Sequence, residues 1–144
     1  MSEKHDEGDD LIQFKIITLG DNGVGKTEII KRFLNNNSEN KTISGTKIKL
    51  KLIDTAGQEN YQALASTYIK NADGVLFVFA LNNQDSFHNI KKWLDNFKEN
   101  NKAIDFNKTI LAYLVGTKSN LEHKISKEEI EELKKENNFY GFLK

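Results

Sequence analysis

The chain has 144 residues, with 21 Lys and Arg against 21 Asp and Glu, so its formal net charge is zero. This length predicts one domain, and the balanced charge argues against a protein that binds nucleic acid through a basic surface. The sequence contains no cysteine, which excludes disulfides, thiolate metal sites and lipid anchors attached to sulfur.

The N-terminal stretch is acidic and has no apolar run, so it is not a signal peptide. We expect residues 1–12 to form a disordered leader, followed by one domain over residues 13–144. The longest apolar run, Val75–Leu81, is far shorter than the roughly 20 residues that a bilayer crossing requires. We therefore expect a cytoplasmic protein.

Apolar periodicity predicts strands that alternate with helices. The expected strands are Gln13–Leu19, Lys47–Ile53, Gly74–Leu81, Thr109–Val115 and the start of another at Phe139–Leu143. The expected helices are Glu28–Leu34, Tyr61–Asn71, Ser86–Asn100 and one that opens with a capping box at Ser126 and Glu129 and runs to about Glu136. Residues Asn35–Gly45 are polar and are expected to form a loop.

This order of elements predicts a three-layer α/β sandwich with a mostly parallel sheet. Gly74–Leu81 is apolar on both faces, which is typical of a central parallel strand. Lys47–Ile53 alternates between lysines and apolar residues. A strand with one charged face favours an antiparallel position at the edge of the sheet.

The segment Gly20–Thr27 (GDNGVGKT) fits the pattern G-x-x-x-x-G-K-[ST] and lies between a predicted strand and a predicted helix. In that context the pattern indicates the phosphate-binding loop of a P-loop NTPase. Its glycines, Gly20, Gly23 and Gly25, allow the backbone to wrap an anion with successive N–H groups pointing inward.

Each remaining position of this loop also has an expected role. Lys26 offers an ammonium group to the β- and γ-phosphates of a nucleotide, and the Thr27 hydroxyl can bind Mg²⁺. Asp21, Asn22 and Val24 complete the phosphate-binding set. We expect the Asn22 side chain, near the γ-phosphate, to affect hydrolysis more than binding.

A second informative segment, Leu52–Glu59 (LIDTAGQE), follows the lysine-rich strand. Asp54 at the end of that strand is placed as a Walker-B acid that reaches Mg²⁺ directly or through water. The Gly57 N–H can sense a γ-phosphate, and the Gln58 side chain can orient the attacking water. Because Asp-x-x-Gly alone is a common turn, this assignment depends on its combination with the phosphate loop.

GDNGVGKT and DTAGQEN together resemble the phosphate motifs of Ras-superfamily small GTPases. YQALASTYIKNADG, NQDSFHNIKKWL and LVGTKSNL are similar to segments of the Rab branch. The resemblance covers Phe14 to Lys144 and implies a GDP- and GTP-binding switch that uses Mg²⁺ and acts in vesicle traffic. It also implies a GTPase-activating protein, an exchange factor and effectors as partners, and recruitment to endomembranes through a partner.

The loop Thr117–Asn120 (TKSN) stands where this family has the base-reading motif Asn-Lys-x-Asp. The resemblance makes Thr117, Lys118 and Asn120 the base-binding residues. Asn120 has one acceptor oxygen where the family aspartate has two, so guanine preference is expected to weaken by roughly 10–100-fold. Thr117 lacks the amide with which the family asparagine helps to tie this loop to the phosphate loop.

Two further departures concern the switch region and the end of the chain. The resemblance places Thr42 as the switch threonine that binds Mg²⁺, and it leaves the second strand of the family essentially missing. The edge of the sheet is then expected at Lys47–Ile53. The sequence stops at Lys144, before the final helix of the family, so one face of the sheet is expected to expose an apolar patch.

We therefore predict a Rab-like small GTPase. Hydrolysis is expected to be slow without a partner, because the single arginine, Arg32, is not placed to act as an arginine finger. The altered base loop and the shortened switch region favour an alternative, a degenerate GTPase that binds nucleotide or acts as a scaffold without turnover. A P-loop kinase or ATPase is a third reading, and DTAGQ has no natural role in it.

Overall fold

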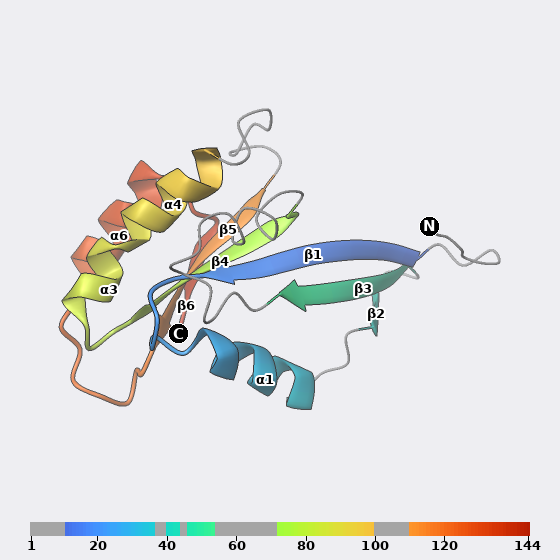
Figure 1. Ribbon diagram of the computed structural model, residues 1–144, viewed down its shortest axis with the longest axis horizontal. Coiled ribbons are helices and arrows are strands. Elements are labelled where there is room, and N and C mark those ends of the chain that lie inside the picture. The colour runs from blue at the N-terminus through green and yellow to red at the C-terminus, as the bar shows by residue number, and fades with distance from the viewer. Residues whose placement is uncertain (1–10, 37–39, 44–45, 54–71, 100–109) are drawn as a thin grey trace.

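Strands and helices alternate along the chain, as their apolar patterns predict. The computed structural model describes residues 11–36, 40–43, 46–53, 72–99 and 110–144 (Figure 1). The strands are β1 (Leu11–Leu19), β2 (Asn40–Ile43), β3 (Thr46–Ile53), β4 (Gly74–Ala80), β5 (Leu111–Thr117) and β6 (Gly141–Leu143). The described helices are α1 (Lys26–Asn36), α3 (Gln84–His88), α4 (Ile90–Glu99) and α6 (Lys127–Glu136).

The described strands form one sheet in the order β2-β3-β1-β4-β5-β6. β1 pairs in parallel with β3 and β4, and β5 pairs in parallel with β4 and β6. β2 pairs with β3 in the antiparallel direction. The predicted α/β sandwich with a mostly parallel sheet and an antiparallel edge strand is therefore confirmed.

The identity of the edge strand was predicted wrongly. Lys47–Ile53 lies inside the sheet as part of β3, between β1 and β2, and it runs parallel to β1. The second strand is present as the four residues of β2, within the segment that was expected to be a loop. Alternation of lysines with apolar residues indicates that one face of a strand is exposed to solvent. It does not indicate whether the strand has a neighbour on one side or on both sides.

Two other boundaries differ from the prediction. β1 begins at Leu11, which pairs with Lys47, so the last two residues of the expected leader belong to the domain. The expected helix Ser86–Asn100 consists of α3 and α4, with Asn89 in a turn between them. The Asn89 N–H donates to Asp85 O (2.9 Å) and the Trp93 N–H donates to Asn89 O (3.2 Å), so helical hydrogen bonding continues across this turn. Residues 1–10 and the expected helix 61–71 lie outside the described residues.

α6 begins with the predicted capping box. Ser126 Oγ accepts the Glu129 N–H at 3.1 Å, and the Ser126 N–H donates to Glu129 Oε1 at 3.0 Å. That hydrogen bond from the Ser126 backbone stabilises the charged carboxylate and lowers the pKa of Glu129 below its ordinary value. The reciprocal pair satisfies two donors that a helix start otherwise leaves without partners.

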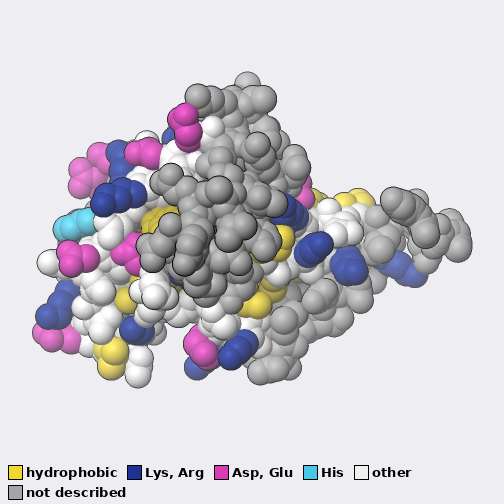
Figure 2. Space-filling model, in the orientation of Figure 1, with side chains coloured by type: hydrophobic (Ala, Val, Ile, Leu, Met, Phe, Trp, Pro, Cys, Tyr) yellow, Lys and Arg dark blue, Asp and Glu magenta, His cyan; other side chains and the backbone are white. Residues whose placement is uncertain are grey.

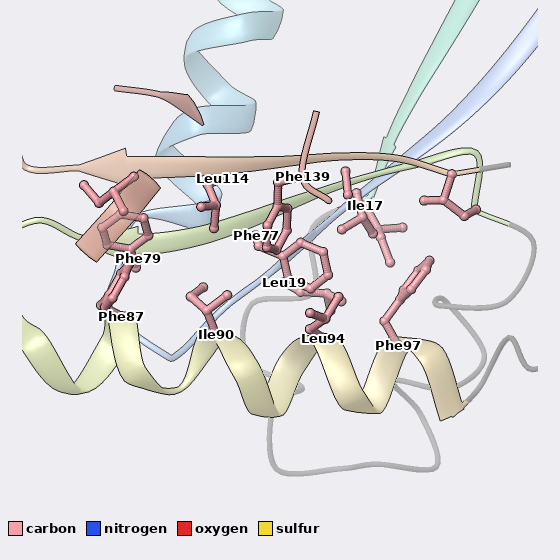
Figure 3. Packing of buried hydrophobic residues seen from close by; sticks show 14 of the residues in the cluster. Ile17, Leu19, Phe77, Phe79, Phe87, Ile90, Leu94, Phe97, Leu114 and Phe139 are labelled. Atoms are coloured by element: carbon pink, nitrogen blue, oxygen red, sulfur yellow. The ribbon is translucent and has the colours of Figure 1, made fainter. Parts of the chain in front are cut away.

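The larger core lies on the face of the sheet that α3, α4 and α6 cover (Figure 1). Phe87, Ile90, Leu94 and Phe97 follow the spacing of one helical face and point toward the sheet (Figure 3). Their partners include Phe79, whose ring centroid lies 5.0 Å from that of Phe87, in an edge-to-face arrangement. This packing fixes α3 and α4 against β4, next to the carboxyl end of β1.

The opposite face of the sheet carries α1 and a smaller core. Val78, Ala80 and Val115 are buried there, and Ile29 of α1 packs against them. Strand alternation places four exposed apolar side chains on this same face. They are Ile12, Phe14, Leu111 and Leu143.

The outer surface is mixed in charge. In the view of Figure 2, acidic and basic side chains are interspersed over the side of the molecule that carries α4 and α6. This agrees with the zero net charge of the sequence. None of the described helices combines the length and the apolar character that crossing a bilayer demands.

The α4 packing gives a first test. Leu94 is fully buried, so Leu94→Ala should lower the free energy of unfolding by about 2–5 kcal/mol through lost burial and a residual cavity. Lys92→Ala, an exposed position on the same helix, should change it by less than about 0.5 kcal/mol. Urea unfolding followed by circular dichroism measures both, and equal effects would contradict the packing described here.

Candidate functional site

The phosphate loop connects the carboxyl end of β1 to the start of α1 (Figure 1). Gly23 has φ +84° and Gly25 has φ +104°, backbone conformations that side chains strongly disfavour. A Cβ at Gly20 would overlap the carbonyl oxygen of Val78 in the neighbouring strand. The glycines of the motif are therefore required by the backbone path and by its close approach to β4.

Lys26 lies at the centre of this loop. Its side chain is only 3% exposed, and Nζ donates to Gly20 O and to Asp21 O, both at 2.8 Å. A buried ammonium is costly unless hydrogen bonds replace its hydration, and the loop supplies them from its own carbonyls. The arrangement fixes a positive charge inside a loop that begins the helix α1, whose N-terminus also favours anions.

The neighbouring loop positions divide into buried and exposed ones. Val24 is buried and belongs to the smaller core, so it anchors the loop to the sheet. Asn22 and Gly23 are exposed and form the rim. Thr27 follows Lys26 in the first turn of α1 and is partly exposed. Its hydroxyl oxygen is the type of ligand that Mg²⁺ prefers.

Asp21 has a set of contacts that the sequence did not reveal. Asn89 Nδ2 donates to Asp21 Oδ2 at 2.6 Å, and Trp93 Nε1 donates to Asp21 Oδ1 at 2.9 Å. Trp93 lies on α4 and also packs against the larger core. Apolar periodicity places it on α4 but does not indicate what its indole N–H meets, because that partner lies in a distant loop.

Thr117 joins the predicted base loop to the phosphate loop. Its hydroxyl donates to Val24 O (2.5 Å) and lies 3.2 Å from Phe79 O. Its methyl group would lie 3.5 Å from a Cβ added at Gly25, so the two loops are packed side by side. Thr117 lacks the amide of the family asparagine, and its hydroxyl at the end of β5 makes a link to the phosphate loop in place of that amide.

Lys118 makes a second connection between the same loops. It has φ +57°, and its Nζ donates to Gly23 O at 3.2 Å across the rim of the phosphate loop. Asn120 is exposed in the following turn, which is closed by a hydrogen bond from Leu121 N–H to Lys118 O. The structure therefore brings Thr117 and Lys118 to the phosphate loop and places Asn120 beyond them.

Of the remaining predicted site residues, only Thr42 lies among those that the structure describes. Asp54, Gly57 and Gln58 lie outside the described residues. Thr42 pairs with Lys47, and Lys47 pairs with Leu11 at the amino end of β1. Because the phosphate loop follows the carboxyl end of β1, Thr42 does not join the site in this structure.

The described part of the chain fits Mg²⁺ only as a partial site. It holds no group of three or more His, Cys, Asp or Glu side chains that could form a metal cage. Mg²⁺ commonly binds one or two protein oxygens together with substrate phosphates. The Thr27 hydroxyl, beside the predicted phosphate loop, suits that mode.

Comparison with known proteins gives a consistent result. Residues 15–144 match the model of the Ras family. "Ras-related protein Rab-13" of Bos taurus is 34% identical over 145 residues, which cover 90% of this chain and 69% of that protein. "GTP-binding protein ypt3" of Schizosaccharomyces pombe is 37% identical over 151 residues, covering 94% and 67%. "Ras-related protein rab-11.1" of Caenorhabditis elegans is 34% identical over 137 residues, covering 85% and 62%.

The Thr117 connection can be tested by isosteric substitution. Thr117→Val keeps the shape but removes the hydroxyl, and it should lower the free energy of unfolding by about 1–3 kcal/mol because Val24 O loses its donor. Thr117→Ser retains the hydroxyl, so its free energy of unfolding should stay closer to that of the wild type. Chemical denaturation compares the two variants, and equal losses would show that the hydrogen bond contributes nothing.

Proposed function

Because the chain belongs to the Ras family and resembles Rab and Ypt proteins over most of its length, we propose that it is a Rab-like GTPase that switches between GDP- and GTP-bound states with Mg²⁺. The observation that supports this most directly is the Lys26 ammonium held at 2.8 Å by Gly20 O and Asp21 O inside the glycine-rich loop. A loop built around one buried cation is suited to the phosphate chain of a nucleotide.

Phosphate binding would use groups that are already in place. Gly23 and Gly25 allow the loop to turn its N–H groups toward an anion, and Lys26 adds a full positive charge. Since these groups are positioned before the ligand arrives, little reorganisation is needed when a phosphate binds. The hydrogen bond from Thr117 to Val24 O holds the phosphate loop next to the end of β5. The nucleotide base is expected to bind at the loop that follows this strand.

Mg²⁺ would be held by the hydroxyl of Thr27 and the carboxylate of Asp54, together with phosphate oxygens. When bound, the ion neutralises charge on the β- and γ-phosphates. Gln58 is proposed to orient the attacking water, and the Gly57 N–H to contact the γ-phosphate. Arg32 is exposed on α1, several residues beyond the phosphate loop, so we expect slow hydrolysis without a partner protein.

The base site favours a second candidate function. Asn120 cannot offer two carboxylate oxygens to guanine, so the chain could bind nucleotide with weak selectivity and serve as a module without turnover. Both candidates share the same phosphate loop. They differ in whether phosphate is released.

We further propose that the protein works in vesicle traffic at endomembranes, recruited by partner proteins. A GTPase-activating protein, an exchange factor and effectors are the partners that a switch of this kind requires. The support for this role is the similarity to Rab and Ypt proteins over most of the chain.

The central prediction concerns Lys26. Lys26→Ala should weaken binding of a fluorescent GDP in the presence of Mg²⁺ by more than roughly 100-fold, because a buried charge partner is lost. Lys31→Ala, an exposed lysine on the same helix, should bind like the wild type. An unchanged affinity of Lys26→Ala would refute the site.

Turnover and base preference separate the candidate functions. Titration with fluorescent GDP, XDP and ADP gives the base preference, and phosphate release from GTP gives the turnover. Guanine binding with phosphate release supports the GTPase, and binding without release supports the module. Preference for ADP would favour a P-loop kinase or ATPase instead.

Asn120 gives a gain-of-function test. Asn120→Asp should restore the second acceptor for guanine and raise the affinity for GDP by roughly 10–100-fold, with no such gain for ADP. Competition against fluorescent GDP measures both affinities. Equal affinities of the variant and the wild type for GDP would show that this side chain does not read the base.

A further inference from the structure

The second residue of the phosphate loop, Asp21, is held by two side chains from a distant part of the chain. Its Oδ2 accepts Asn89 Nδ2 at 2.6 Å, and its Oδ1 accepts Trp93 Nε1 at 2.9 Å. Asn89 lies in the turn between α3 and α4, and Trp93 lies one helical turn further along α4. Both carboxylate oxygens are thus engaged by donors of one short helical segment.

Asp21 also touches the buried lysine through its backbone. The Asp21 carbonyl oxygen accepts Lys26 Nζ at 2.8 Å. The same residue therefore receives hydrogen bonds from Asn89 and Trp93 on its side chain and from the Lys26 ammonium on its main chain. Because both ends of the residue are held, the side-chain hydrogen bonds restrain the Asp21 backbone, whose displacement would move the carbonyl that helps to position Lys26.

The charge of Asp21 makes this restraint important. A carboxylate in a loop that binds phosphate would repel the ligand if it turned toward the mouth of the loop. Hydrogen bonds to an ionised acceptor are shorter and stronger than neutral ones. Asn89 and Trp93 therefore hold the negative charge against the helices, where two donors stabilise it.

The donors are themselves fixed in place. Trp93 is partly buried and packs against the larger core. Asn89 is held by hydrogen bonds from its N–H to Asp85 O and from the Trp93 N–H to its own carbonyl. The contact thus joins the loop to a helical segment that is itself packed against the core and hydrogen-bonded.

We propose that Asp21, Asn89 and Trp93 form a positioning relay, which holds the phosphate loop and Lys26 in the binding conformation and makes Trp93 respond to nucleotide. This inference rests on the proposed function. None of the three side chains needs to touch the nucleotide, so all three act through Lys26 and the loop backbone. Trp93 is the single tryptophan of the chain, so its fluorescence reports directly on the relay.

The first test compares conservative variants in the full chain. Asp21→Asn keeps the size but replaces one acceptor by a donor that faces Asn89 or Trp93, and Trp93→Phe keeps an aromatic ring but removes the N–H. Each should weaken binding of fluorescent GDP with Mg²⁺ by roughly 10-fold, as loss of an outer supporting contact typically does. Asp95→Asn, the same chemical change at an exposed position of α4, should leave the affinity unchanged.

A double substitution separates the relay from a general loss of stability. If the two residues act through one contact, the affinity of the Asp21→Asn, Trp93→Phe protein should fall no further than that of either single variant. Losses that multiply would overturn the relay. Thermal unfolding of each variant is recorded alongside, and if Asp21→Asn does not fold, Trp93→Phe and the fluorescence measurement below decide the question.

Fluorescence provides a readout that a purely structural role would not change. Saturating the wild type with Mg²⁺ and GDP should shift the Trp93 emission, and the Asp95→Asn variant should show the same shift. Asp21→Asn should show less than half of it. If the wild type binds GDP but its emission does not change, the relay is overturned and the proposed function stands. Equal GDP affinities of the variants and the wild type have the same meaning. A wild type that binds none of the nucleotides overturns the proposed function and the relay with it.

Discussion

The buried ammonium of Lys26 is the interaction on which the rest of the site depends. At 3% exposure it has lost nearly all of its hydration, and carbonyls of its own loop replace that water at 2.8 Å. Between these carbonyls and Lys26 the backbone turns through Gly23 and Gly25, both with positive φ. The charge, the loop path and the glycines are therefore one physical unit.

That unit is supported from three sides by the parallel sheet and its helices. Gly20 lies against the Val78 carbonyl of β4, and Thr117 at the end of β5 donates to Val24 O. Asn89 and Trp93 reach Asp21 from the helical layer. Because the carboxyl ends of parallel strands meet at one edge, segments far apart in the sequence can all contact a loop of eight residues, Gly20–Thr27.

The same architecture explains how the predicted base loop is connected to the phosphate loop through Thr117. A threonine hydroxyl is short, and it makes its contact because Thr117 ends a strand that is hydrogen-bonded to β4 along seven register pairs. Its position is set by the ladder, so even a small polar group reaches Val24 O. Asn120 lies in the exposed turn beyond the strand, where the sheet imposes no such constraint.

Local sequence by itself determined the phosphate loop, the apolar face of α3 and α4, and the capping box of α6. Each of these depends on residues within a few positions of one another, through backbone freedom, helical period or a short side-chain reach. Only the tertiary structure decided that β3 is an interior strand, that Thr117 holds the phosphate loop, and that Trp93 binds Asp21 across 72 positions. Those contacts depend on which strands become neighbours and at what register, and a one-dimensional pattern of apolar and polar residues carries no information about either.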